Sequence, residues 1–106
     1  MFEIPAYADI RKQQGQTCAL QYLVSGRTDE LVQEGVLVEV GERFEQGGYE
    51  RFSLLIHAVE NCPPRQGMYA VTLPGMRVQQ WFLVPIAREG NRIVYEACFN
   101  RAASTA

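Results

Sequence analysis

Residues 79–100 read QQWFLVPIAREGNRIVYEACFN, and this stretch indicates the fold class of the protein. Its WFLV and RIVYEACF segments are rich in aromatic and β-branched residues, which favour strands. We expect Pro85 to end the first strand, because proline has no N–H for the ladder. The polar residues 87–91 then form a loop, and residues 92–99 form the closing strand of one β core.

The rest of the chain has the same organisation of short strands separated by turn residues. Pro74 and Gly75 fit the two central positions of a type II turn, so residues 68–85 are predicted to form a hairpin. Segment 61–67 contains two adjacent prolines and is expected to be irregular. Segment 49–60 is largely apolar on both faces, which predicts a central strand. Further strands are expected at 17–24 and 31–44, followed by a turn at 45–48.

Segment 31–44 shows an apolar period of two that marks a half-buried strand. Its valines occupy even positions, so the even face is expected to be the buried one. Gly35 interrupts the pattern and predicts a bulge or a close approach of a neighbouring backbone. The valines that define this face are Val32, Val36, Val38 and Val40.

One short helix is predicted at residues 5–14. Pro5 suits the first helical turn, where its missing N–H is not needed. Tyr7 and Ile10 share one face of the helix, and Gly15 suits its C-terminal cap. A helix of this length is unstable alone, so we expect it to dock on the β core.

These elements predict a mainly β protein, a small single-domain antiparallel barrel or sandwich of about six strands with one short N-terminal helix. We expect the β domain to span residues 1–100 and a flexible C-terminal tail to span residues 101–106. A helical turn is also expected to begin at Thr28, which would cap it. An open sheet edge has to be paired or protected, so a homo-oligomer is one expected state.

Charge and composition exclude several classes of protein. The net charge is −2, and the basic residues are spread along the chain, so we expect no nucleic-acid partner. No run of about 18 apolar residues and no signal-peptide pattern is present, so we expect no membrane segment and a cytoplasmic location. Three cysteines without CxxC spacing argue against disulfides. Cys18 and Cys98 are expected to be small core residues.

Residue types that carry catalysis are sparse. His57 is the only histidine, and a nucleophile pair with Cys62 would need hydrogen-bond contact and a third orienting group. His57 and the three cysteines would give the ligand count of a zinc site, but they lack the usual close pairing. We predict no catalytic residue, cofactor or metal, and a Cys–His enzyme is the least favoured function. Two acidic pairs are expected to be solvated on strand faces: Glu39 with Glu42, and Glu45 with Glu50.

A protein-binding surface is the remaining candidate site. Tryptophan, tyrosine and arginine are the usual anchors of protein interfaces. We expect Trp81 either to anchor an interface together with Tyr49 and Tyr22, or to be a core residue covered by the N-terminal helix. A small-molecule site inside a barrel is an alternative function. Large side chains are expected to fill that interior instead: Phe52, Phe82, Tyr95 and Phe99.

Four short motifs carry a resemblance to a known family: FSLL at 52–55, Gln66-Gly67 followed by Tyr69, FLVP at 82–85 and YEACFN at 95–100. They resemble the motifs of an uncharacterised family of short bacterial proteins, a domain of unknown function. The resemblance implies a folding signature without catalytic residues, and an association with phage-tail-like collar or fibre proteins. The expected function is a non-enzymatic protein–protein interaction or assembly module, accessory to a phage-tail-like or surface structure.

Overall fold

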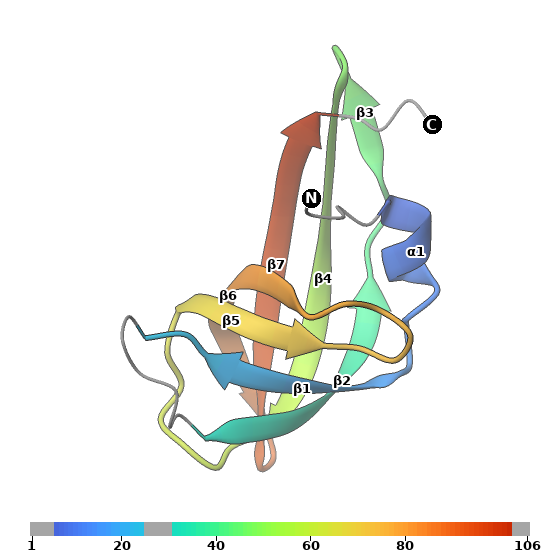
Figure 1. Ribbon diagram of the computed structural model, residues 1–106. Coiled ribbons are helices and arrows are strands. Elements are labelled where there is room, and N and C mark those ends of the chain that lie inside the picture. Colours follow the sequence, from blue (N-terminus) through green and yellow to red (C-terminus); the bar gives the residue numbers. More distant parts are fainter. Residues whose placement is uncertain (1–5, 25–30, 103–106) are drawn as a thin grey trace.

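The computed structural model describes residues 6–24 and 31–102, which form one short helix and seven strands (Figure 1). The prediction of a helical turn at Thr28 lies outside the described residues. In chain order, the elements are α1 (Tyr7–Arg11), β1 (Thr17–Tyr22), β2 (Val32–Val40), β3 (Phe44–Gln46), β4 (Tyr49–Val59), β5 (Gly67–Thr72), β6 (Gln79–Glu89) and β7 (Arg92–Ala102).

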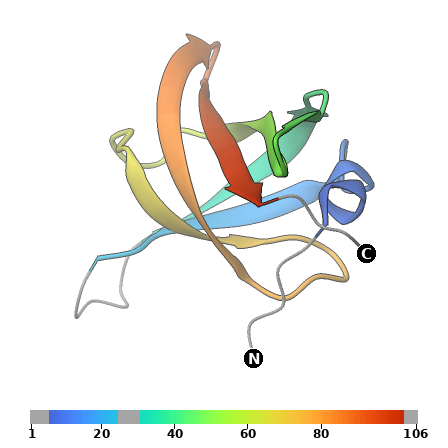
Figure 2. The ribbon, with the colours of Figure 1, turned by 90° about the horizontal axis from the view of Figure 1, so that it is seen from above.

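Six of the strands close into an antiparallel barrel in the order β1-β2-β4-β7-β6-β5, and β5 pairs again with β1. Figures 1 and 2 show these strands curving around one interior. The seventh strand, β3, pairs only with the beginning of β4. The predicted mainly β fold is therefore confirmed, and the barrel is the correct one of its two alternatives.

The barrel interior is filled by large apolar side chains, as alternation along half-buried strands requires. Tyr69 and Tyr95 are fully buried, with ring centroids 5.5 Å apart. Ile10 of α1 is also fully buried and belongs to the same core. Trp81 is only 6% exposed and packs edge-to-face on Phe99 at 5.4 Å. The structure thus places Trp81 in the core.

The N-terminal helix is shorter than predicted, but it docks as expected. Its buried side carries Ile10, with Tyr7 half-buried beside it, and the chain leaves through a turn at residues 12–15. The predicted C-terminal cap at Gly15 is wrong, because α1 ends at Arg11 and Lys12 occupies the C-cap position. Gly15, with a φ of +91°, lies at the end of the turn that follows. Pro5 lies outside the described residues.

The predicted buried face of β2 is wrong. Gln33 and Leu37 point inward, whereas Val32 is 51% exposed. The inward Gln33 is tolerated because its side chain donates a hydrogen bond to the Val59 carbonyl at 3.0 Å. A register shift after Leu37 then returns Val40 to the core.

The Gly35 prediction is confirmed as a close backbone approach. A Cβ added there would lie 3.0 Å from the His57 carbonyl oxygen and 3.1 Å from the Ile56 side chain. A side chain at Gly35 would therefore require the His57 carbonyl or the Ile56 side chain to shift where β2 pairs with β4.

Two strands run further than predicted. Pro85 does not end β6, because a register shift between Pro85 and Ala87 accommodates it and the ladder continues to Glu89. Only residues 90–91 connect β6 to β7, instead of the predicted loop at 87–91. β7 continues to Ala102, so residues 101 and 102 are part of the sheet and not of a tail.

Two residues expected in the core face outward instead. Phe82 is 51% exposed, since it alternates with the buried Trp81 and Leu83. Cys98 is exposed because it lies between the inward residues Ala97 and Phe99 of β7.

Candidate functional site

Part of the sheet projects beyond the barrel, and we call residues 43–53 and 98–102 the arm. Pairing of β2 with β4 ends at Leu54, and pairing of β6 with β7 ends at Glu96. Beyond these points, β4 lies between β3 and β7 in a short three-stranded sheet (Figure 1). The arm is therefore the part of the sheet that the barrel does not enclose.

The arm has two different faces, because side chains alternate along each strand. Glu45, Glu50 and Arg101 are cross-strand neighbours and define the inner face. Phe44 and Arg51 form a directly opposed pair on the outer face. Tyr49 lies two residues before Arg51 on that same outer face, so Phe44 and Tyr49 are diagonal neighbours, within reach of each other's aromatic rings.

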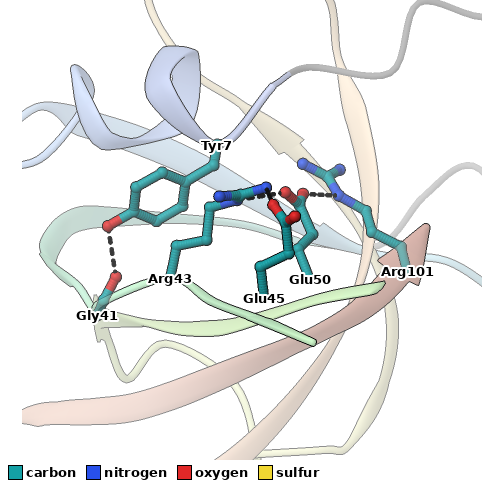
Figure 3. A network of polar contacts seen from close by, with 6 residues as sticks. All are labelled: Tyr7, Gly41, Arg43, Glu45, Glu50 and Arg101. Atoms are coloured by element: carbon teal, nitrogen blue, oxygen red, sulfur yellow. Dashed lines mark hydrogen bonds and ion pairs between the residues drawn. The ribbon is translucent and has the colours of Figure 1, made fainter. Parts of the chain in front are cut away.

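The inner face holds a buried carboxylate between two arginines (Figure 3). Glu50 is 2% exposed and accepts hydrogen bonds from Arg43 Nε at 2.6 Å and from Arg101 Nε at 2.7 Å. Arg43 also forms an ion pair with Glu45. The hydrogen bond from Arg43, aided by Arg101, lowers the pKa of Glu50 against the opposing effect of burial. Glu50 is therefore an ionised structural group, with both carboxylate oxygens engaged.

This arrangement corrects the expectation for Glu45 and Glu50. They lie opposite one another across β3 and β4, but Glu50 is buried and not solvated. General acid catalysis at neutral pH needs a raised carboxyl pKa, whereas the pKa of Glu50 is lowered. The pair therefore stabilises the arm and does not suit acid–base chemistry.

Helix α1 braces the base of the arm. The Tyr7 hydroxyl donates to the Gly41 carbonyl at 2.8 Å (Figure 3), and Arg11 donates to the Val40 carbonyl at 3.3 Å. The Tyr7 ring packs edge-to-face on Phe52 at 4.9 Å. These contacts fix the segment where the chain leaves β2 for β3.

The outer face of the arm presents two large aromatic side chains to solvent. Phe44 is 60% exposed and Tyr49 is 62% exposed. Next to Phe44 lies a groove of about 280 Å³, whose lining includes Arg51 and Cys98. A groove of this size, beside exposed aromatic rings and one guanidinium, suits an apolar side chain of a partner protein.

The three residues predicted for an interface have different environments. Trp81 is buried in the core, so it is not an exposed anchor as the first alternative required. Tyr22 is half-buried, and the Arg65 guanidinium lies 3.9 Å from its ring centroid. Only Tyr49 is exposed. Of the predicted residues, Tyr49 alone belongs to the candidate site.

The residues considered for covalent or metal chemistry are dispersed. His57 lies on the outward side of β4, between the buried Ile56 and Ala58. Cys62 follows in the loop after β4, and within the described part of the chain no hydrogen bond joins it to His57. Burial raises the pKa of the Cys18 thiol to about 11. In residues 6–24 and 31–102, no group of three or more His, Cys, Asp or Glu side chains is placed to hold a metal ion.

Sequence reasoning missed Phe44, Arg43 and Arg101 as parts of the site. The Gly47-Gly48 pair was the available signal, since two glycines with positive φ make a tight hairpin and place Phe44 near Tyr49. Arg101 gave no local signal, because its partner Glu50 lies on a distant strand.

By its fold, the protein is a small antiparallel β-barrel with a projecting arm. The chain belongs to the family described as a domain of unknown function (DUF6916), whose model matches residues 5–99. No curated protein and no solved structure matches the chain. Among the described residues, no helix is long and apolar enough to cross a membrane.

Proposed function

We propose that this protein is a non-enzymatic interaction or assembly module that binds a partner protein through the outer face of the arm. One observation carries the proposal: Phe44 and Tyr49 are exposed together on an arm whose other face is fixed by a buried ion cluster. Exposed aromatic residues on a preorganised surface lose little conformational freedom on binding.

The charge on the outer face adds specificity. Arg51 lies opposite Phe44 and lines the groove together with Glu42. An apolar side chain of the partner would enter the groove, and a partner carboxylate would pair with Arg51. The partner surface is therefore expected to combine an aliphatic or aromatic anchor with an acidic group.

The family resemblance of the sequence motifs indicates which kind of partner to expect. We propose a component of a phage-tail-like or surface structure, met in the cytoplasm of a bacterial cell. The alternative of a small-molecule-binding barrel is less favoured, because Tyr69, Tyr95 and Leu83 occupy the interior.

Affinity capture from the source organism tests the proposal. The wild-type protein is expected to retain one abundant partner, and a Phe44→Ala/Tyr49→Ala variant is expected to lose it. Truncation of a hot-spot residue costs about 2 kcal/mol or more, so the Kd measured with the purified partner should rise roughly 30-fold.

Val78→Ala is the matched control, since Val78 is 58% exposed and lies outside the arm. Both variants should unfold at the wild-type temperature. An unchanged Kd for the double variant would remove the arm from the interface.

A further inference from the structure

A second surface, on the barrel itself, is mostly apolar and is uncharged among the residues that the structure describes. On the outside of β1, β5 and β6, Leu23 donates its backbone N–H to Met68, and Met68 lies directly opposite Phe82. These three side chains are 37%, 40% and 51% exposed. They form a row of large hydrophobic residues across the barrel wall.

The neighbouring row extends this surface. Gln21 pairs with Val32 on one side and with Ala70 on the other, and Ala70 pairs with Gln80. Val32 is 51% exposed. We call the two rows, together with Val84, the neutral face: Val32, Gln21, Ala70, Gln80, Leu23, Met68, Phe82 and Val84.

The neutral face contains no ionisable side chain, although the chain has 22 charged residues, 12 acidic and 10 basic. The nearest cross-strand charges lie at its borders, where Glu34 pairs with Ala19 and Glu96 pairs with Val84. Interface centres are depleted of charge and enriched in methionine and aromatic residues. The composition of this surface is therefore that of an interface.

We infer that the neutral face binds the neutral face of a second copy of this chain, in a two-fold symmetric dimer. In a two-fold contact, a surface meets itself, so any charge near the axis meets a like charge. The neutral face avoids this repulsion, because none of its eight side chains is ionisable. This inference concerns a different surface from the proposed partner site.

The barrel topology favours contact between faces over strand addition. β5 pairs with β1 on one side and with β6 on the other. Its backbone edges are thus occupied by its neighbours, and a second copy has only the side chains of this wall to contact. The net charge of −2 also leaves little overall repulsion between copies.

Sedimentation equilibrium of Phe82→Lys and Phe82→Glu variants tests the dimer. Wild-type protein is expected to be a dimer at micromolar concentration, and each variant alone a monomer, because it places like charges across the axis. A mixture of the two variants is expected to dimerise again, since the charges then oppose one another. Phe44→Lys on the arm is the matched control and should remain dimeric.

Two outcomes would overturn the inference. One is a wild-type protein that stays monomeric up to millimolar concentration. The other is a pair of variants that fail to recombine although both unfold at the wild-type temperature. Loss of the captured partner in Phe82→Glu, with a monomeric wild type, would assign this face to that partner. Loss of the captured partner only in the Phe44→Ala/Tyr49→Ala variant would leave the proposed function intact.

Discussion

The barrel wall of β1, β5 and β6 and the arm of β3, β4 and β7 are held by different forces. The wall is paired on both sides and buries the side chains of Leu20, Val71 and Leu83 completely. The arm lies at the end of the sheet, and its inner face contains an ionised carboxylate between two guanidinium groups. The wall therefore depends on hydrophobic burial, whereas the arm also depends on charge.

The largest effect should come from removing the central charge of the arm. Glu50→Ala leaves Arg43 and Arg101 facing each other without their shared partner. We expect a loss of about 3 kcal/mol in unfolding free energy, at the low end of the range for a broken buried ion pair. The low end applies because the two arginine side chains remain 31% and 23% exposed.

Urea unfolding followed by circular dichroism measures this loss. Glu45→Ala is the control, since Glu45 is half exposed and should contribute at most about 1 kcal/mol. Equal losses for the two variants would show that the arm does not depend on the buried charge.

A smaller effect is expected at Gly35, where β2 lies close to β4. Gly35→Ala forces a methyl group against the His57 carbonyl and the Ile56 side chain, which should destabilise the fold by about 2 kcal/mol. Gly41→Ala, at the base of the arm, places its Cβ 3.2 Å from the Ser53 carbonyl oxygen and should cost less. Thermal unfolding of both variants compares them, and the reverse order would mean that the barrel yields more readily than the arm.

The smallest effect should come from acid, which protonates Glu50 without removing its side chain. Its pKa in the folded protein is lowered below the usual value of 4.5. The stabilisation is therefore fully present above about pH 4.5 and is lost as the pH falls through the lowered pKa. The stability difference between wild type and Glu50→Gln should shrink in this acid range, as measured by urea unfolding at each pH. A difference that is constant from pH 6 to pH 3 would contradict the ion cluster.

Much of the fold could be predicted from local patterns. The patterns in 49–60 and 92–99 predict two strands, which the structure contains, and the expected interior residues Phe52 and Tyr95 are buried. The turn at Pro74 is also correct. The inward face of β2 could not be predicted in this way. Its valines occupy the even positions. The hydrogen bond from Gln33 nevertheless allows that side chain to be buried, and the register shift after Leu37 changes which residues point inward.

The candidate site was less predictable because it depends on pairing between distant strands. Tyr49 is a predicted site residue because tyrosine, like tryptophan and arginine, is a usual interface anchor. Arg101 was assigned to a tail, because nothing in its neighbours indicates that it meets Glu50. Tryptophan is a residue type common among interface anchors, and only the register of β6 shows that Trp81 points inward.

Closure of the barrel depends on a pairing between two strands that are far apart in the sequence. The β5–β6 and β6–β7 pairings join neighbours in the sequence, whereas β1 reaches β5 only after a long loop has closed, with Leu20 opposite Val71. Non-local pairings of this kind slow folding to milliseconds or longer. Until β1 pairs with it, the backbone edge of β5 stays open beside the exposed side chains of Met68 and Phe82. The kinetic hazard of aggregation is therefore concentrated on the wall that we propose for self-association.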